Sequence, residues 1–283
     1  MIRTLAYFQN SASLNSREPL AAFLSGARRH GLTTIADSLD ADAAVIWSVL
    51  WAGRMRANQQ IYQHYRSRNK PVIVIDVGAL VRNVTWKIAV NHVTAQGHYG
   101  HTQDLDLDRP AKLGLCLGNT PTQSPAVLIC AQHALSLQMQ NYASVEDWIK
   151  LVLARGQQHT NRPFVIRPHP RSTLRRDLLP KNVDIQDPNK IRDTYDSFDL
   201  QFKYHAIVNH NSGPGIQAAI QGCRPVVDAS SLAYPVCVDW TNIEQPYDLD
   251  RTQWLIELSH TEYTVAEMEQ GTWFPRISKF LND

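Results

Sequence analysis

The sequence is poor in cysteine and has no long apolar run. Its four cysteines, Cys116, Cys130, Cys223 and Cys237, are scattered, mostly flanked by apolar residues, and form no CxxC pair. This spacing argues against a disulfide framework and a zinc site, and it predicts four reduced thiols in a cytoplasmic protein. No apolar run approaches the length of a membrane span, and residues 1–10 lack the long apolar core of a signal peptide.

A strong excess of charge is also lacking. The formal net charge is +2 and the sequence pI is about 8.3, so electrostatics neither require nor exclude a nucleic-acid partner. An apolar content of 43% and a charged content of 19% are typical of a globular protein. A chain of 283 residues fits two medium-sized domains better than one large domain.

The two halves share one pattern, in which a strand, a turn and a helix lead to a second strand. That second strand follows a basic residue and a proline and ends in an aspartate. The pattern covers residues 43–47, 54–68 and 70–76 in the first half, and 206–208, 216–221 and 223–228 in the second. Further strands are predicted at 2–8, 126–130 and 163–166, and a helix at 145–155. Continuous apolar strands that alternate with helices predict parallel sheets covered on both faces. The expected fold class is therefore α/β, with two Rossmann-like doubly wound domains facing a cleft.

Turn-rich composition near residues 105–125 predicts the join between the domains. We expect an N-terminal domain over 1–115, a nucleotide-binding domain over 116–260, and a helical tail over 261–283 that packs back on the first domain. In the tail, the helix is expected from Thr264 to Phe280.

A small-residue turn in the second half is the most informative stretch. Asn211, Ser212 and Gly213 follow a buried strand and precede a short helix that Gly222 ends. A helix N-terminus presents free backbone N–H groups and favours an anion, so a nucleotide phosphate is the predicted occupant. The alternative is a polar helix cap that needs no ligand.

A second segment strengthens this interpretation. The motif Arg167-Pro168-His169-Pro170 follows another buried strand, about forty residues before the turn. Together the two segments resemble the capsule-polysaccharide type of glycosyltransferases, which have the GT-B fold. The whole chain also resembles proteins of unassigned role from tailed bacteriophages, on residues 85–92, 97–100 and 231–236.

The resemblance implies that a sugar moves from a nucleotide-sugar donor to a hydroxyl, without a metal or other cofactor. It implies Asp76 as the general base and His169 as the group that stabilises the leaving phosphate. The other implied residues fall into three sets: Arg167, Arg171, Asn211, Ser212 and Gly213 for the donor phosphate, Gln132, His133, Gln217, Asp228, Ser231 and Tyr234 for the donor nucleoside or sugar, and Asn91, His92, His98 and Tyr99 for the acceptor. Gln217 stands where many GT-B enzymes have a ribose-binding glutamate, so the resemblance does not identify the nucleotide of the donor.

Several alternatives stay open at this point. Asp76 and Asp228 can equally be turn residues, and His169 can be a local cap. The pair His98 and His101 resembles metal ligands but has no acid or cysteine nearby. The acceptor is either a hydroxymethylated pyrimidine in phage DNA, in the host cytoplasm, or a glycan. The rival functions are a sugar-nucleotide epimerase on the same fold and a non-catalytic nucleotide-binding protein.

Overall fold

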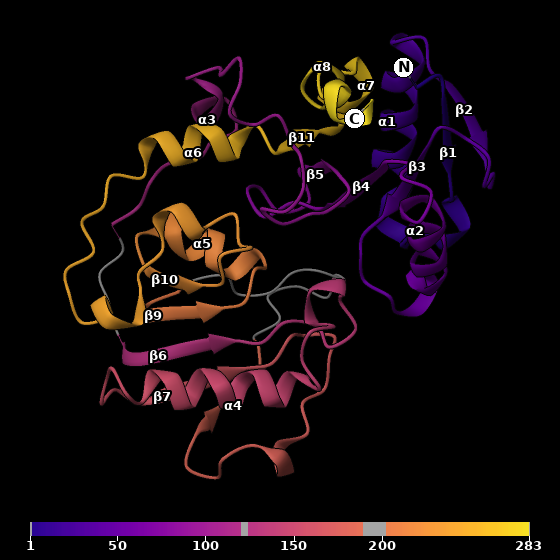
Figure 1. Ribbon diagram of the computed structural model, residues 1–283. Helices are drawn as coiled ribbons and strands as arrows, with labels where there is room; N and C mark the ends of the chain where they lie inside the picture. The colour runs from indigo at the N-terminus through magenta and orange to yellow at the C-terminus, as the bar shows by residue number, and fades with distance from the viewer. Residues whose placement is uncertain (1, 120–123, 189–201, 283) are drawn as a thin grey trace. The chain divides into compact units, whose positions relative to one another are not determined.

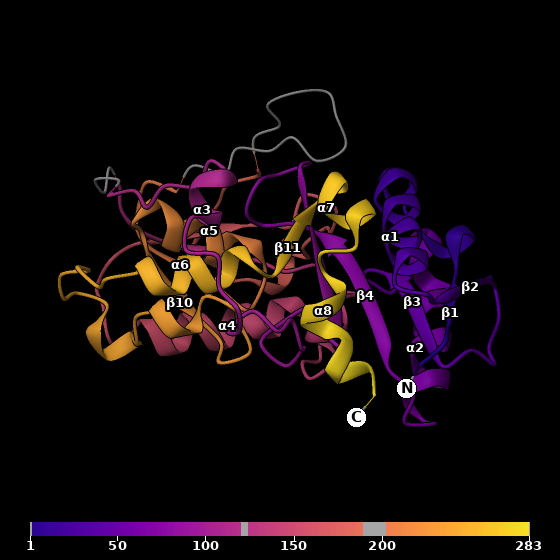
Figure 2. The ribbon, with the colours of Figure 1, turned by 90° about the horizontal axis from the view of Figure 1, so that it is seen from above.

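The structure is a computed structural model that describes residues 2–119, 124–188 and 202–282, so residues 120–123 of the predicted linker lie outside it. Contacts divide the chain into two compact units. Unit 1 comprises residues 1–115 with 255–283, and unit 2 comprises residues 116–254. Each unit has its own β-sheet with helices packed on it, as the labels of Figure 1 and the second view of Figure 2 show.

Unit 1 contains a six-stranded sheet with the order β11-β5-β4-β3-β1-β2. Its strands are β1 (Thr4–Tyr7), β2 (Thr33–Ala36), β3 (Ala43–Trp47), β4 (Val72–Val77), β5 (Thr85–Val90) and β11 (Glu262–Thr264). The strands β1 to β4 are parallel, and the chain runs from β1 to β2 on one side and to β3 and β4 on the other. This part of the sheet confirms the predicted doubly wound arrangement.

Two strands of unit 1 were not predicted from the sequence. Strand β5 is antiparallel to β4, and β11 is antiparallel to β5, so the sheet is mixed, with parallel strands from β1 to β4. A parallel return needs a long crossover, whereas only residues 78–84 connect β4 to β5. The turn is tight, because a Cβ atom on Gly78 would lie 2.1 Å from the carbonyl oxygen of Thr85.

Helices pack on both faces of the unit 1 sheet. They are α1 (Arg17–Arg29), α2 (Asn58–Arg66), α7 (Val265–Gln270) and α8 (Phe274–Ile277), and the same unit contains the short helix α3 (Arg109–Lys112). Helix α1 buries Phe23 in one core cluster with Val45 and Ile73. Helix α2 contacts β3 and β4, whose alternate residues point to the other face. The predicted helix over 54–68 is instead a 3-10 helix, Gly53–Ala57, followed by the shorter α2.

The C-terminal segment packs against α1 as several short helices instead of the one predicted over 264–280. Gly271, in the left-handed region with φ of 78°, ends α7, and Pro275 stands at the start of α8. A 3-10 helix, Ser278–Leu281, follows. Helices α1 and α7 approach closely at Gly26, where an added Cβ atom would lie 2.1 Å from the carbonyl oxygen of Met268.

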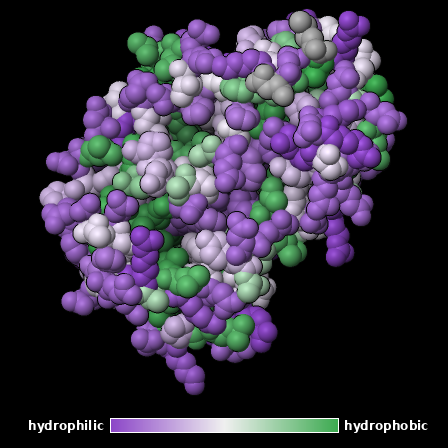
Figure 3. Space-filling view, in the orientation of Figure 1, coloured by the Kyte–Doolittle hydropathy of each residue, from purple (hydrophilic) through white to green (hydrophobic). Residues whose placement is uncertain are grey.

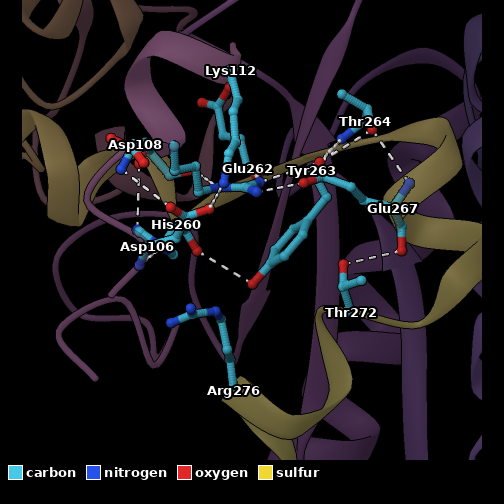
Figure 4. A network of polar contacts seen from close by, with 12 residues as sticks. Asp106, Asp108, Lys112, His260, Glu262, Tyr263, Thr264, Glu267, Thr272 and Arg276 are labelled. Carbon is cyan, nitrogen blue, oxygen red and sulfur yellow. Dashed lines mark hydrogen bonds and ion pairs between the residues drawn. The ribbon is translucent and has the colours of Figure 1, made fainter. Parts of the chain in front are cut away.

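A polar network fixes this segment to the rest of unit 1 (Figure 4). The guanidinium of Arg109 donates to the carbonyl oxygens of Ser259 and Glu262, each at 2.7 Å, and pairs with Glu267. Glu267 also forms a capping box with Thr264 at the start of α7. Residues at least 150 positions apart are thus joined around one cation.

Unit 2 contains a five-stranded, wholly parallel sheet with the order β10-β9-β6-β7-β8. Its strands are β6 (Ser124–Cys130), β7 (Phe164–Arg167), β8 (Asp184–Ile185), β9 (Tyr204–Asn209) and β10 (Arg224–Val227). Helix α4 (Val145–Gly156) and helix α5 (Gly213–Gln221) were both predicted from the sequence, and the structure confirms them, as it does the strands on either side of α5.

The two helices cover opposite faces of this sheet. Helix α4 shares a core cluster with Val127 and Ile129 of β6, whereas Ala218 of α5 packs with the alternate residue Leu128. Gly222 caps α5 in the left-handed region, with φ of 86°. Helix α6 (Thr252–Ser259) leads the chain from unit 2 back into unit 1.

Exposed hydrophobic side chains do not form one large patch on the face drawn in Figure 3, where hydrophobic residues stand in separate groups among hydrophilic ones. No helix among the described residues is long and apolar enough to cross a membrane.

Candidate functional site

The loops at the carboxyl ends of the unit 2 strands hold most of the predicted donor residues. From β6 the chain proceeds to β7 and β8 on one side, and then to β9 and β10 on the other. The order of the strands therefore switches between β6 and β9. Ligands of open parallel α/β sheets bind outside the carboxyl ends at such a switch point. Gln132 and His133 follow β6, and Asn211 and Ser212 follow β9.

The turn before α5 is held by Asn209. Its side-chain oxygen accepts a hydrogen bond from the backbone N–H of Ser212 at 2.8 Å, and its amide donates to the carbonyl oxygen of Cys130 at 3.1 Å. Ser212 is the N-cap residue of α5, yet its side chain makes no capping bond to the helix. Gly215 faces Val227 so closely that a Cβ atom would lie 2.7 Å from its Cγ1. The first turn of α5 is therefore fixed in place, with a hydroxyl and backbone N–H groups at its end.

Asn211 links three loops at this edge. Its backbone N–H donates to the side-chain oxygen of Gln132 at 3.4 Å, and its amide donates to the hydroxyl of Ser230 at 2.8 Å. Ser230 in turn donates to Asp228 through its hydroxyl, at 2.5 Å, and its backbone N–H, at 2.9 Å. Burial opposes ionisation of Asp228, but the bonds from Ser230 and the nearby His210 lower its pKa below the ordinary value. Asp228 is thus an ionised turn residue within reach of the site.

Two histidines lie together at the ends of β6 and β7. The ring centroids of His133 and His169 are 5.1 Å apart at an interplanar angle of 74°. In each ring Nδ1 accepts a hydrogen bond of 3.1 Å from the backbone N–H two residues further on, that of Leu135 or Arg171. A neutral ring held in this way carries its proton on Nε2. Burial and the charge of Arg171 lower the pKa of His133, which favours that neutral form. The pair thus supplies two oriented Nε2–H donors.

The side chain of Arg167 contacts other residues than the two histidines and the Ser212 turn. Its guanidinium donates to Gln186 at 3.2 Å and lies 5.8 Å from the ring centroids of Phe202 and Tyr204. Its Nε and Nη1 are buried and have no hydrogen-bond partner among the described residues. No contact of Arg167 with the Ser212 turn is found in the described part of the chain. Arg171, by contrast, is exposed.

The remaining donor candidates are placed differently from one another. Gln217 is half-buried on α5, and Tyr234 is 47% exposed at the start of a 3-10 helix, Tyr234–Val236. Ser231 has no exposed surface, and its hydroxyl accepts from the backbone N–H of Ala233. The position of Ser231 favours a structural role.

Unit 1 has its own polar edge at the carboxyl ends of β3 and β4. Asp76 accepts a hydrogen bond from the hydroxyl of Ser48 at 3.2 Å and from the backbone N–H of Val77 at 2.7 Å. Ser48 directly follows β3 and has a φ of 62°, a conformation that costs a residue with a Cβ atom about 1–3 kcal/mol. Strain of this kind is common at functional sites.

The structure does not bring Asn91 and His92 to Asp76. Because β5 is antiparallel, its carboxyl end lies beside the amino end of β4, and Asn91 bonds there to both backbone groups of Val72. The ring of His92 contacts the hydroxyl of Thr94 at 2.7 Å, and burial lowers the pKa of His92 to about 4. Asn91 and His92 thus make local contacts at the end of β5, away from Asp76. His98 likewise stacks on Phe280, with 4.7 Å between ring centroids.

The sequence analysis missed two charged residues near Asp76. Glu262 is 1% exposed, and its carboxylate accepts from the backbone N–H groups of Ala79 at 2.6 Å and Leu80 at 3.0 Å. It also accepts from the hydroxyl of Thr85 at 2.7 Å. Lys87 lies in the centre of β5 and is 7% exposed. The signal for Lys87 was a lysine inside an otherwise apolar strand, but nothing in the local sequence marks Glu262.

The described residues contain no group of three or more His, Cys, Asp or Glu side chains that could hold a metal ion.

Comparison with solved structures identifies the architecture. The chain resembles KpsC of Thermosulfurimonas dismutans, described as a beta Kdo 2,7 transferase, with a TM-score of 0.51, 12% identity, and coverage of 98% of this chain and 99% of the other. A beta Kdo 2,4 transferase KpsC of the same organism matches with a TM-score of 0.47 and 12% identity, over 92% and 90% of the two chains. No protein-family model and no curated protein sequence matches. The fold is therefore the two-domain, GT-B-like α/β fold that the sequence predicted.

Proposed function

We propose that this chain is a glycosyltransferase that moves a sugar from a nucleotide-sugar donor to a hydroxyl group. The observation that carries the proposal is the edge of unit 2, where the Ser212 turn, the N-terminus of α5 and the His133–His169 pair follow the carboxyl ends of three neighbouring parallel strands. All of these groups are donors, as an anionic phosphate requires. The full-length likeness in fold to a Kdo transferase supports the same class of reaction by analogy.

The proposed roles follow the positions of the side chains. Asn211, Ser212 and Gly213 bind the donor phosphate at α5, and His169 with Arg171 stabilises the phosphate that leaves. Gln132, His133, Gln217, Asp228 and Tyr234 remain candidates for the nucleoside or sugar. Arg167 and Ser231 are omitted because their contacts lie elsewhere. Asp76 in unit 1 is the proposed general base.

We propose that the reaction is metal-independent, because the donors at α5 and the two histidines can meet the phosphate charge. Transfer should therefore persist in EDTA. Loss of transfer in EDTA with recovery on adding a divalent cation would refute this part of the proposal.

The first experiment is a thermal-shift screen with UDP, CMP and GDP and their sugars, including nucleotide-activated Kdo because of the comparison. A ligand at about 100 times its Kd stabilises the folded state by about 2.7 kcal/mol. His169→Ala should remove the shift and leave the unliganded Tm unchanged. His159→Ala is the matched control, because this half-buried histidine lies in the loop between α4 and β7, at the other end of the sheet.

Two results would refute the transferase proposal. One is the absence of a shift with every nucleotide, and the other is a shift that His169→Ala does not diminish. A donor consumed without any acceptor would favour the epimerase, and binding without turnover would favour a binding protein.

A second assay, with a labelled donor, identifies the acceptor. The resemblance to phage proteins supports a 5-hydroxymethylpyrimidine in DNA, and the likeness to a Kdo transferase supports a glycan hydroxyl. A base in duplex DNA would have to be flipped or single-stranded. Label found in hydroxymethylated single-stranded DNA, and absent from unmodified DNA of the same sequence, would select the first acceptor.

A further inference from the structure

Lys87 is a lysine in a largely buried position. The residue is 7% exposed, and no hydrogen bond or ion pair of its side chain is found among the residues that the structure describes. A lysine is rarely buried to this extent unless it is paired, because removing an ammonium group from water is costly. The position of Lys87 therefore requires an explanation beyond the packing of β5.

Strand register places Lys87 between two carboxylates. It stands opposite Asp76 of β4 and opposite Glu262 of β11. Directly opposed residues of antiparallel strands share one face, with Cβ atoms about 4.5–5.5 Å apart. Both carboxylates already accept hydrogen bonds from other groups, Asp76 from Ser48 and Glu262 from the loop after β4. Strand register thus holds Lys87 near both carboxylates.

Tyr99 is a second donor of the same kind. It follows the bridge that pairs His98 with Val90 of β5, is 1% exposed, and has a buried hydroxyl without a hydrogen-bond partner in the described structure. Burial, and after it the charges of Glu262 and Asp76, raise the pKa of Tyr99 well above the ordinary value. The phenol therefore stays protonated and lies near the same row of strand residues.

Two unpaired donors beside a carboxylate define the chemistry of the group they fit. A hydroxyl oxygen can accept from both donors while its proton is donated to a carboxylate. An anion would meet repulsion from Asp76 and Glu262, and a cation would meet repulsion from Lys87. A neutral polyol, such as a sugar, is therefore the matching ligand.

We propose that Lys87 and Tyr99 bind the oxygen of the acceptor hydroxyl whose proton passes to Asp76, and this rests on the proposed transferase function. Asp76 is only half-buried, so the hydroxyl approaches from its side. As the acceptor oxygen bonds to the anomeric carbon, its O–H bond breaks and the proton moves to Asp76. The bond from the anomeric carbon to the donor phosphate breaks, and its electron pair leaves with the nucleotide. The Lys87 ammonium stabilises the charge that develops on the acceptor oxygen.

The kinetic test compares Lys87→Met and Tyr99→Phe with Lys279→Met, which changes an exposed lysine of the same unit. Lys87→Met should lower kcat/KM for the acceptor by about 100-fold, as removal of an oxyanion donor does. Tyr99→Phe should lower it by about 10-fold, the effect of one hydrogen bond. Donor KM should stay unchanged in both variants, and the Tm of Lys87→Met should be equal to or above that of the wild type, because an unpaired buried charge has been removed.

Two results would overturn the inference. Unchanged acceptor kinetics in both variants is the first. The second is a large fall in the Tm of Lys87→Met with normal acceptor kinetics, because that would make Lys87 a structural counter-ion for Asp76 and Glu262.

A binding test keeps the inference separate from the transferase proposal. Glucose and galactose at millimolar concentration serve as neutral polyol probes in a thermal-shift assay without any nucleotide. A shift in the wild type that disappears in Lys87→Met supports the site even if no donor binds. If neither sugar shifts the wild type, the polyol site is refuted. If nucleotides still raise the Tm of the wild type, the transferase proposal stands without the polyol site.

Discussion

Replacing Glu262 by glutamine should destabilise unit 1 far more than its conservative chemistry suggests. The carboxylate is buried and accepts three hydrogen bonds, from the backbone N–H groups of Ala79 and Leu80 and from the hydroxyl of Thr85. Glutamine replaces one acceptor oxygen by an NH₂ group, which then faces a backbone donor. A buried N–H left without an acceptor costs about 1–3 kcal/mol, and the remaining bonds lose charge assistance worth about 1–2 kcal/mol more. The expected loss in the free energy of unfolding is therefore about 2–5 kcal/mol.

The assay is urea unfolding, combined with hydrogen exchange at the amides of Ala79 and Leu80 because the two units can unfold separately. Glu269→Gln is the control, since this glutamate is exposed on α7, and its effect should stay within about 0.5 kcal/mol. Faster exchange at both amides should accompany the loss of stability. If the two variants unfold alike and the two amides keep their protection, the carboxylate does not hold the loop after Asp76.

Two further changes test the packing and the pH response of unit 1. Gly26→Ala should lower the free energy of unfolding by about 1–3 kcal/mol, because the new Cβ would lie 2.1 Å from the carbonyl oxygen of Met268. This loss is expected although alanine is a better helix former than glycine. Ser25→Ala in the same helix is the control, and equal urea midpoints for the two variants would refute the argument. Burial lowers the pKa of His92 to about 4 from an ordinary 6.5. Between these two pH values the unfolded chain takes up a proton that the folded chain does not. The free energy of unfolding should therefore fall as the pH drops from about 6.5 to about 4. His92→Gln should reduce that fall, measured as the difference in urea midpoint between pH 7 and pH 4.5; a fall as steep as in the wild type would contradict it.

Most strands and the two main helices of the second half could be predicted from the sequence because the described strands there follow one rule. All five strands of unit 2 are parallel, so polar residues after each apolar run gather at one edge of the sheet. Gln132, His133, His169 and Asn211 are found at that edge for this reason. The backbone hydrogen bond that orients each of the two imidazoles was not predictable, since it depends on the turn geometry after β6 and after β7. The side-chain direction of Arg167 likewise depends on two residues of another strand region, Phe202 just before β9 and Tyr204 at its start.

In the first half the same rule fails at one strand, and the failure explains what was missed. Asn91 and His92 were expected to bind the acceptor, but β5 runs antiparallel to β4 and carries them to the end of β4 that is far from Asp76. An antiparallel strand brings its first residues, not its last, to the edge where the parallel strands end. Lys87 reaches Asp76 in this way, and Glu262 of β11 stands next in the row although 186 positions separate it from Asp76. Side chains in the first half of an antiparallel strand that adjoins a parallel sheet therefore belong among the site candidates, and in this protein they include the one buried lysine among the described residues.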